Sequence, residues 1–190
     1  MKTDQQRSSA VWINFLLFQS VYTLSLVGVI NGLSWLGCVA LGAFALWHAC
    51  TATTAKSDFV IAGIAMFAGF LLDTLYIRSG LITYSGSMLW SGVAPVWIVA
   101  LWANFALTFN GCLRWLRSRL WLAATLACIG SPLSYYAGIR LGTATITGDA
   151  TLLFGLIALT WGITVPALLW LSSQVERQMQ SRHSVLLPAI

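Results

Sequence analysis

The chain has 190 residues, of which 58% are hydrophobic and 8% are charged, with a formal net charge of +5. A typical soluble domain carries roughly a quarter charged residues, so this composition excludes an ordinary soluble fold. The apolar residues come in long blocks separated by short polar stretches, which is typical of several membrane spans. We therefore expect an all-α, polytopic transmembrane helical bundle that forms one domain over residues 1–173, followed by a cytoplasmic tail over residues 174–190.

Six apolar stretches are long enough to be spans, since a span needs about 20 apolar residues to cross a hydrocarbon core of about 30 Å. The expected spans cover residues 11–30, 33–53, 59–77, 88–113, 120–139 and 151–172. The first stretch is longer than the roughly 7 to 15 apolar residues of a signal peptide, so we expect it to be retained. Gly, Ser, Thr and charged residues break the chain between the spans.

The Lys and Arg residues indicate an orientation, because cytoplasmic loops of membrane proteins are enriched in them. With the N-terminus inside, the cytoplasmic set is Lys2, Arg7, Lys56, Arg114, Arg117, Arg119, Arg177 and Arg182. The outer set is Arg78 and Arg140. Both termini are therefore predicted to be cytoplasmic. Since the basic residues sit mainly at span ends, no nucleic-acid partner is expected.

An acidic residue, Asp73, lies inside the third span, in the stretch GFLLDTLYIRSG. Counted from the inner end of the span, it lies about 21 Å along its helix, which is too deep for a loop residue. A carboxylate at a helix centre costs roughly 2.5 to 3.5 kcal/mol, so Asp73 should face the bundle and find a partner. The same count places Tyr135, in the fifth span, at the same level.

Two layers of polar side chains follow from these depths. The outer layer of ligand-binding candidates comprises Asp73, Tyr84, Tyr135, Tyr136 and Arg140. The inner layer comprises Asn14, Gln19, His48, Asn104 and Asn110. Two interpretations stay open for both layers. The side chains either bond across helices to fix packing, worth about 0.6 kcal/mol each, or line a cavity. In an enzyme, Asp73 would be the general acid or base, with Tyr135 and Arg140 supplying hydrogen bonds and charge.

Metal and cofactor motifs are missing from the sequence. His48 has no HxxxH or HxxE companion, and the acids within the spans fall on the opposite side of the membrane, so no metal site is expected. The four cysteines show no CxxC spacing, and no P-loop, dinucleotide or GxSxG motif occurs, so no cofactor is expected. No repeat relates the two halves of the chain, although many transporters are built from repeats.

Four stretches carry a resemblance to a known family. They are NFLLFQ from Asn14, GFLLD ending at Asp73, PVWIVALWANFALTFNGCLRWL from Pro95, and GSPLSYYAGIRLG from Gly130. Together they resemble an uncharacterised family of small bacterial inner-membrane proteins, a domain of unknown function. The resemblance implies a multi-pass protein of the bacterial cytoplasmic membrane, encoded near enzymes that modify membrane fatty acids. Family members often have His after the equivalent of Asn110, where this chain has Gly111, which disfavours a histidine-based site there.

The leading hypothesis is a protein that binds a lipid or other amphipathic molecule within the bilayer, or helps to modify it. Its partners would be membrane lipids and lipid-modifying enzymes, and whether it is itself an enzyme stays open. The alternatives are a small proton-coupled transporter or permease, and a scaffold that holds partner enzymes at the membrane. Small residues at four-residue spacing, such as Ala65 with Gly69, favour close helix packing and would also allow a homo-oligomer.

Overall fold

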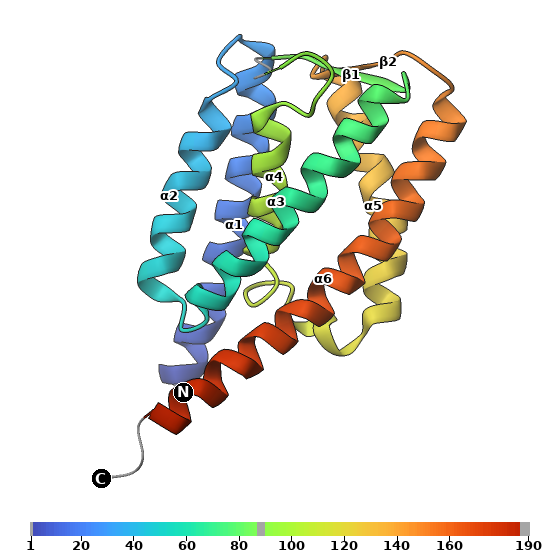
Figure 1. The fold of residues 1–190 in the computed structure, drawn as a ribbon. Coiled ribbons are helices and arrows are strands. Elements are labelled where there is room, and N and C mark those ends of the chain that lie inside the picture. The colour runs from blue at the N-terminus through green and yellow to red at the C-terminus, as the bar shows by residue number, and fades with distance from the viewer. Residues whose placement is uncertain (1, 87–89, 187–190) are drawn as a thin grey trace.

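The computed structural model describes residues 2–86 and 90–186, and the side chains within residues 9–86 and 90–181. The described residues form six α-helices, one 3-10 helix (η1) and two short strands, which confirms the predicted all-α bundle (Figure 1). In chain order these are α1 (Lys2–Ile30), α2 (Leu36–Thr51), α3 (Ala55–Arg78), β1 (Ile82–Tyr84), α4 (Val96–Ala106), η1 (Arg114–Ser118), α5 (Leu120–Arg140), β2 (Ala144–Ile146) and α6 (Ala150–Leu186).

The bundle has two distinct ends (Figure 1). One end, here called the terminal end, carries the start of α1, the α2–α3 turn, η1 and the end of α6. The other, the strand end, carries β1, β2 and the α1–α2 turn. Both described chain ends therefore lie on the same side. The eight Lys and Arg residues predicted to be cytoplasmic belong to segments of the terminal end, whereas Arg78 and Arg140 end α3 and α5 at the strand end.

Four of the described helices are long and apolar enough to cross a membrane: Ser9–Ile30, Ala55–Arg78, Leu120–Arg140 and Ala150–Ser181. The 16 residues of α2 and the 11 of α4 are shorter. At 1.5 Å per residue these two helices measure about 24 Å and 17 Å, less than a hydrocarbon core of about 30 Å. The predicted span 33–53 is thus shorter than expected.

The predicted span 88–113 is wrong as a continuous helix. Residues 88 and 89 lie outside the described residues, and α4 begins only at Val96, after Pro95. It ends at Ala106, and residues 107–113 form turns that lead into η1. Leu107, Thr108 and Phe109 are buried in these turns. Irregular backbone at membrane depth is tolerated where the protein buries it, as it does here.

The predicted boundary at residue 173 does not interrupt the structure. Helix α6 begins at Ala150 and continues to Leu186, through most of the segment that was predicted to be a separate tail. Glu176 is 8% exposed and lies against η1 through an ion pair with Arg117. That pair joins the residues after 173 to the bundle. Residues 187–190 of the predicted tail lie outside the described residues.

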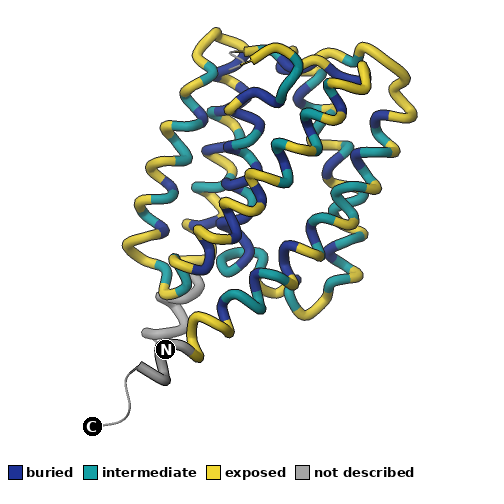
Figure 2. Tube along the Cα trace, in the orientation of Figure 1, coloured by how far each residue is buried: buried dark blue, intermediate teal, exposed yellow. Residues whose placement is uncertain are grey.

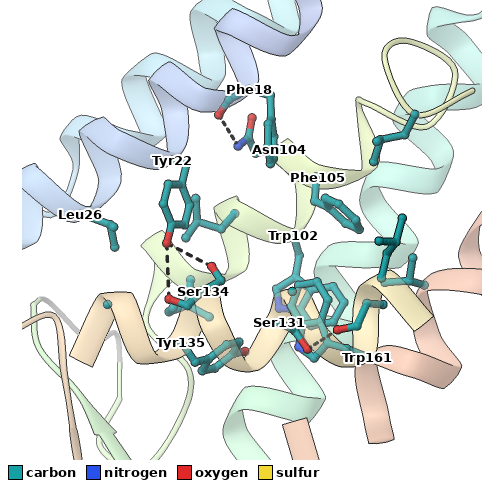
Figure 3. A pocket seen from close by; sticks show the side chains of 18 of the residues that line it. Phe18, Tyr22, Leu26, Trp102, Asn104, Phe105, Ser131, Ser134, Tyr135 and Trp161 are labelled. Carbon is teal, nitrogen blue, oxygen red and sulfur yellow. Dashed lines mark hydrogen bonds between the residues drawn. The ribbon is translucent and has the colours of Figure 1, made fainter. Parts of the chain in front are cut away.

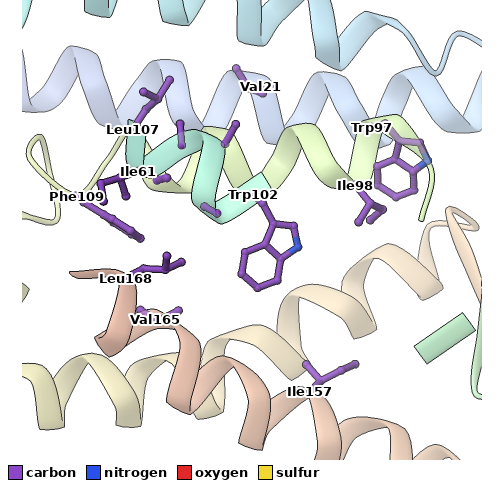
Figure 4. Packing of buried hydrophobic residues seen from close by; sticks show 14 of the residues in the cluster. Val21, Ile61, Trp97, Ile98, Trp102, Leu107, Phe109, Ile157, Val165 and Leu168 are labelled. Atoms are coloured by element: carbon purple, nitrogen blue, oxygen red, sulfur yellow. The ribbon is translucent and has the colours of Figure 1, made fainter. Parts of the chain in front are cut away.

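The helices have exposed outer faces and buried inner faces (Figure 2). Many exposed side chains are large and apolar, and the buried ones form one core. Large side chains such as Trp12, Phe67 and Leu133 are more than 60% exposed. Soluble monomers rarely expose apolar patches of this extent, so these faces fit contact with lipid. Seven of the 11 residues of α4 are buried, which places α4 at the centre, with Trp102 projecting from it toward α6 (Figure 4).

A short repeat relates two ten-residue segments of the chain, although no repeat between the two halves was expected. Residues 77–86 read IRSGLITYSG and residues 139–148 read IRLGTATITG, with five identical positions. Each segment ends a helix and enters a strand. Each also contains a glycine of positive φ at the same position, Gly80 at 69° and Gly142 at 84°. A left-handed residue in that place lets the chain leave the helix and start the strand.

The two repeats are related by a pseudo-two-fold axis. Strands β1 and β2 pair antiparallel with Thr83 opposite its equivalent, Thr145. The N–H of Ser85 donates to the carbonyl of Thr143 at 2.9 Å, and the equivalent N–H of Thr147 donates to Leu81 at 3.0 Å. The symmetry then breaks in the helices. In the described part of the chain α3 packs on α6, whereas the equivalent pair, α5 and α4, does not pack along its length.

Candidate functional site

A cavity of about 350 Å³ lies between α1, α4 and α5 (Figure 3). It lies where α4 and α5 do not pack together as their equivalents, α6 and α3, do. Its α5 wall comprises Ala123, Leu126, Ala127, Gly130, Ser131, Ser134, Tyr135 and Gly138. These positions recur every three or four residues, so they form one face that extends about 22 Å along the helix. Leu126, Gly130 and Ser134 are also exposed, so the cavity opens at the side of the bundle.

The α5 wall consists mostly of small residues. Such faces usually let another helix approach closely in a membrane. Here α1 lies across the cavity, and its Tyr22 reaches Ser134 of α5. The Ser134 hydroxyl donates to the Tyr22 phenol oxygen at 3.1 Å, and that oxygen lies 3.4 Å from the Ser134 carbonyl (Figure 3). The small-residue face of α5 is therefore left as a cavity wall.

Asp73 is fully buried, at 0% exposed, directly behind the cavity. Its Oδ1 accepts hydrogen bonds from the Tyr84 hydroxyl at 2.5 Å and the Tyr135 hydroxyl at 2.7 Å. Its Oδ2 accepts one from the Trp102 indole N–H at 2.9 Å. The prediction that Asp73 and Tyr135 share a level is confirmed. The three donors line the cavity and Asp73 does not, so Asp73 fixes the position of the wall.

Neighbouring residues allow Trp102 and Tyr84 to donate to Asp73. A Cβ on Gly69, one turn earlier in α3, would lie 2.1 Å from the Trp102 ring, so only glycine lets that indole approach α3. Trp102 also stacks on Trp161 of α6, with ring centroids 4.1 Å apart. Burial raises the pKa of the Tyr84 phenol well above its usual range, so Tyr84 keeps its proton and serves as a donor.

Two residues predicted for the outer layer lie elsewhere. Tyr136 is 50% exposed and packs edge-on against Phe154. Arg140 is exposed. Four-residue spacing does place them on one face of α5, but that face points away from Asp73. Tyr136 is rotated by about 100° from Tyr135, and Arg140 by about 140°. The expectation that they join Asp73 is wrong.

In the inner layer, Asn14 fixes the turns that follow α4. Its side-chain N–H donates to the carbonyl of Leu107 at 3.2 Å, and its Oδ1 accepts from the backbone N–H of Cys112 at 3.1 Å. A Cβ on Gly111 would lie 2.4 Å from that Oδ1. Asn14 is 2% exposed and does not line the cavity. This geometry favours the packing interpretation for Asn14.

His48 and Asn110 contact Asp58, an acid that lies just before the predicted span 59–77. His48 Nε2 lies 2.7 Å from Asp58 Oδ2, and the Asn110 side-chain N–H donates to Asp58 Oδ1. Arg117 donates to Asn110 Oδ1 and, at 2.5 Å, to Glu176 Oε2. The expectation that all acids within the spans lie opposite His48 is wrong, because α3 begins at Ala55 and includes Asp58.

Two members of the inner layer remain. Gln19 is exposed. Asn104 is 0% exposed, and its side-chain N–H donates to the carbonyl of Phe18 at 3.1 Å (Figure 3). Of the ten predicted ligand-binding residues, three line the cavity: Tyr84, Tyr135 and Asn104. Sequence reasoning missed most of the cavity wall, although the periodic small residues of α5 were a readable signal.

The chain is similar to one family of known sequences. A family model described as a protein of unknown function, DUF2878, matches residues 11–167. The chain matches no curated protein and no solved structure. The matched range contains Asp73 and every residue that lines the cavity. It also confirms the resemblance to an uncharacterised family. The chain belongs to the DUF2878 family.

Proposed function

We propose that the protein binds a lipid, or a molecule derived from one, in the cavity between α1, α4 and α5. The observation that carries this proposal is an apolar cavity that follows α5 for about 22 Å and opens on a lipid-facing side. Its volume of about 350 Å³ falls in the range of ligand pockets, roughly 300 to 1,000 Å³. A chain-like molecule would enter sideways from the bilayer.

The size of the cavity disfavours a partner helix as its occupant. A helix about 10 Å in diameter and 22 Å long occupies roughly 1,700 Å³, several times the cavity volume. The Tyr22–Ser134 contact between α1 and α5 would also have to break to admit a helix. A narrow, flexible molecule meets neither obstacle.

The geometry supports a positioning role for Asp73 over the general acid or base role expected from the sequence. Both of its oxygens accept hydrogen bonds, and its side chain is shielded from the cavity by Trp102, Tyr84 and Tyr135. By holding these three donors, Asp73 keeps the deep wall rigid. We also propose that the terminal end lies in the cytoplasm, because eight of ten basic residues lie at that end. A bacterial inner membrane is the location that the family resemblance implies, and it is part of the same proposal.

A small transporter is the second candidate, and the internal repeat favours it. Some transporters are built from repeats related by an axis along the membrane normal, with the substrate site at their interface. Asp73 and Tyr135 meet at such an interface here. A transporter must open the cavity to water, which Ser131→Cys would detect in a chain whose four native cysteines are replaced by alanine. A membrane-impermeant maleimide should label that cysteine in a transporter, whereas only a lipid-soluble maleimide should label it in a lipid-binding protein.

Mass spectrometry of copurified lipids tests the leading proposal. Gly130 lines the cavity, and a Cβ there would meet no atom within 4 Å. A leucine at this position would add apolar bulk to the cavity wall, and its Cβ would meet no neighbouring atom. Gly155 on α6 is equally open but does not line the cavity, so Gly155→Leu is the matched control. We expect Gly130→Leu to lose a lipid that the wild type and Gly155→Leu retain. Equal retention by all three would overturn the proposal.

A further inference from the structure

We propose that the arginines between η1 and α6 form a binding site for the phosphate of an anionic phospholipid headgroup. They line a polar hollow of about 410 Å³ at the terminal end of the bundle. No described residue lines both this hollow and the apolar cavity. The inference is therefore independent of the function proposed for the cavity.

Two helices build the hollow, each with one polar face. The lining comprises Arg114, Arg117 and Ser118 of η1, and Ser173, Glu176, Arg177 and Gln180 of α6. The α6 positions recur every three or four residues, so they share one face of that helix. The two η1 arginines are three residues apart, which places them on one face of a 3-10 helix. Three arginines against one glutamate leave the lining with a net charge of +2.

Glu176 holds one of the arginines and leaves the other two available. Its Oε2 accepts a 2.5 Å hydrogen bond from Arg117, whose side chain is 14% exposed. Its Oε1 lies 3.9 Å from Arg114 Nη2, beyond hydrogen-bond distance. Arg177 forms no ion pair with any other residue whose side chain is described. The hollow thus keeps positive charge for a ligand.

The two arginines that would contact the ligand are accessible to it. The Arg114 side chain is 56% exposed, and Arg177 is also exposed. A guanidinium group presents its N–H donors in a planar fork that matches the oxygens of a phosphate group. Two such groups from different helices, beside one hollow, can bind the same phosphate from two sides.

The level of the hollow along the bundle identifies the source of the phosphate. Ser173 follows the last apolar residues of α6, and η1 lies just before α5 begins at Leu120. Exposed tryptophans occur at this level, namely Trp115 at 49%, Trp121 at 72% and Trp170 at 54% exposed. Tryptophan is enriched where the hydrocarbon core meets the headgroups, and basic pockets between membrane helices bind acidic headgroups. The hollow therefore lies where lipid phosphates are concentrated.

Native mass spectrometry of the full-length protein in a neutral detergent tests the inference. The probes are dioleoyl phosphatidylglycerol, which has a net negative charge, and dioleoyl phosphatidylcholine, which has none. We expect the anionic lipid to bind about tenfold more tightly, because basic residues at the membrane surface attract acidic headgroups. The double variant Arg114→Gln, Arg177→Gln should lose most of this preference. The control Lys56→Gln, Arg119→Gln should keep it, because it removes two exposed charges at the same end that do not line the hollow.

Equal loss of the preference in both double variants would show that general surface charge attracts the lipid, and would overturn the inference. Thermal unfolding checks that the variants fold. Arg177→Gln alone, which breaks no ion pair with a described residue, should still reduce the preference if the double variant does not fold.

Inorganic phosphate distinguishes a lipid headgroup from a soluble phosphate compound. Added in excess, it should not displace phosphatidylglycerol. Displacement, together with thermal stabilisation by phosphate alone, would assign the hollow to a soluble ligand and overturn the inference. Gly130→Leu should leave the preference for phosphatidylglycerol unchanged, because Gly130 lines the cavity and not the hollow. The two proposals can therefore fail separately.

Discussion

Tyr135 and Asp73 occupy equivalent positions in the two repeats, and the Tyr135 hydroxyl donates a 2.7 Å hydrogen bond to the Asp73 carboxyl group. Each residue lies seven positions before the glycine of its repeat, Gly80 or Gly142. Identical residues in these two positions would place two acids or two phenols face to face. The repeats have instead diverged to a donor and an acceptor, which join α3 to α5 behind the cavity.

The coupling between Tyr135 and Asp73 can be measured by a double-mutant cycle. We expect Asp73→Asn to lower the free energy of unfolding by about 1 to 3 kcal/mol, because the amide cannot accept from all three donors. Tyr135→Phe should cost about 1 kcal/mol, and the double variant should cost less than the sum of the two. Thermal unfolding in detergent is the measurement. Tyr136→Phe, on the exposed face, should change little, and strictly additive effects would contradict the pairing.

Replacement of Gly69 by alanine should disturb the cavity wall. The new Cβ would overlap the Trp102 ring, so either the ring or α3 must shift, and overpacking of this kind typically costs about 1 to 3 kcal/mol. We expect a lower unfolding temperature and a weakened Trp102–Asp73 hydrogen bond, visible as a change in tryptophan fluorescence. Gly63→Ala on the same helix is the control, because a Cβ there meets no atom within 4 Å. Equal stability of the two variants would show that Trp102 can move freely.

The parts of the fold that depend on local composition were predictable from the sequence. Long apolar runs predicted the membrane helices, and the rise of 1.5 Å per residue was enough to pair the levels of Asp73 and Tyr135. The early end of α4 was not predictable in this way. The run LTFNGCL after Ala106 is mainly apolar, and its turns are held by Asn14, 93 residues before Leu107. Contacts between residues so far apart in the sequence cannot be predicted from a local sequence pattern.

The inner network escaped prediction for a related reason. Asp58 lies two residues after Lys56 and Glu176 follows the last apolar run, and acids in such places are typically solvated residues at helix ends. Their burial depends on His48, Asn110 and Arg117, which come from other elements of the structure. The cavity itself results from the absence of α4–α5 packing in an otherwise pseudo-symmetric arrangement. In the sequence, the features that indicate the cavity are the repeat and the face of small residues on α5.

Truncation of α6 tests whether the residues after 173 belong to the bundle. A chain that ends at Ser181 keeps Glu176, whose carboxylate accepts the 2.5 Å hydrogen bond from Arg117. A chain that ends at Ser173 loses it and leaves Arg117, which is only 14% exposed, without its counter-charge. The cost should be below the roughly 3 to 5 kcal/mol of breaking a buried pair, because the truncation also opens Arg117 to water. We therefore expect the shorter chain to unfold at a lower temperature than the one ending at Ser181.

A single point variant separates this effect from the loss of helix length. Glu176→Gln keeps the helix and removes the charge, so it should reproduce much of the destabilisation. Gln180→Ala, one turn later, should be nearly neutral, because Gln180 makes one long contact of 3.3 Å with Glu176. Full stability of Glu176→Gln would show that the ion pair does not hold α6 to η1.

The orientation of the bundle can be tested with two cysteine variants in a chain whose four native cysteines are replaced by alanine. Thr53 is exposed in the α2–α3 turn at the terminal end, and Ser79 is exposed after α3 at the strand end. If the basic residues set the orientation, a membrane-impermeant maleimide added to intact spheroplasts should label Ser79→Cys and not Thr53→Cys. Permeabilisation should then make Thr53→Cys reactive, which serves as the control for accessibility. The reverse pattern would place the terminal end outside and would mean that eight basic residues had been carried across the membrane.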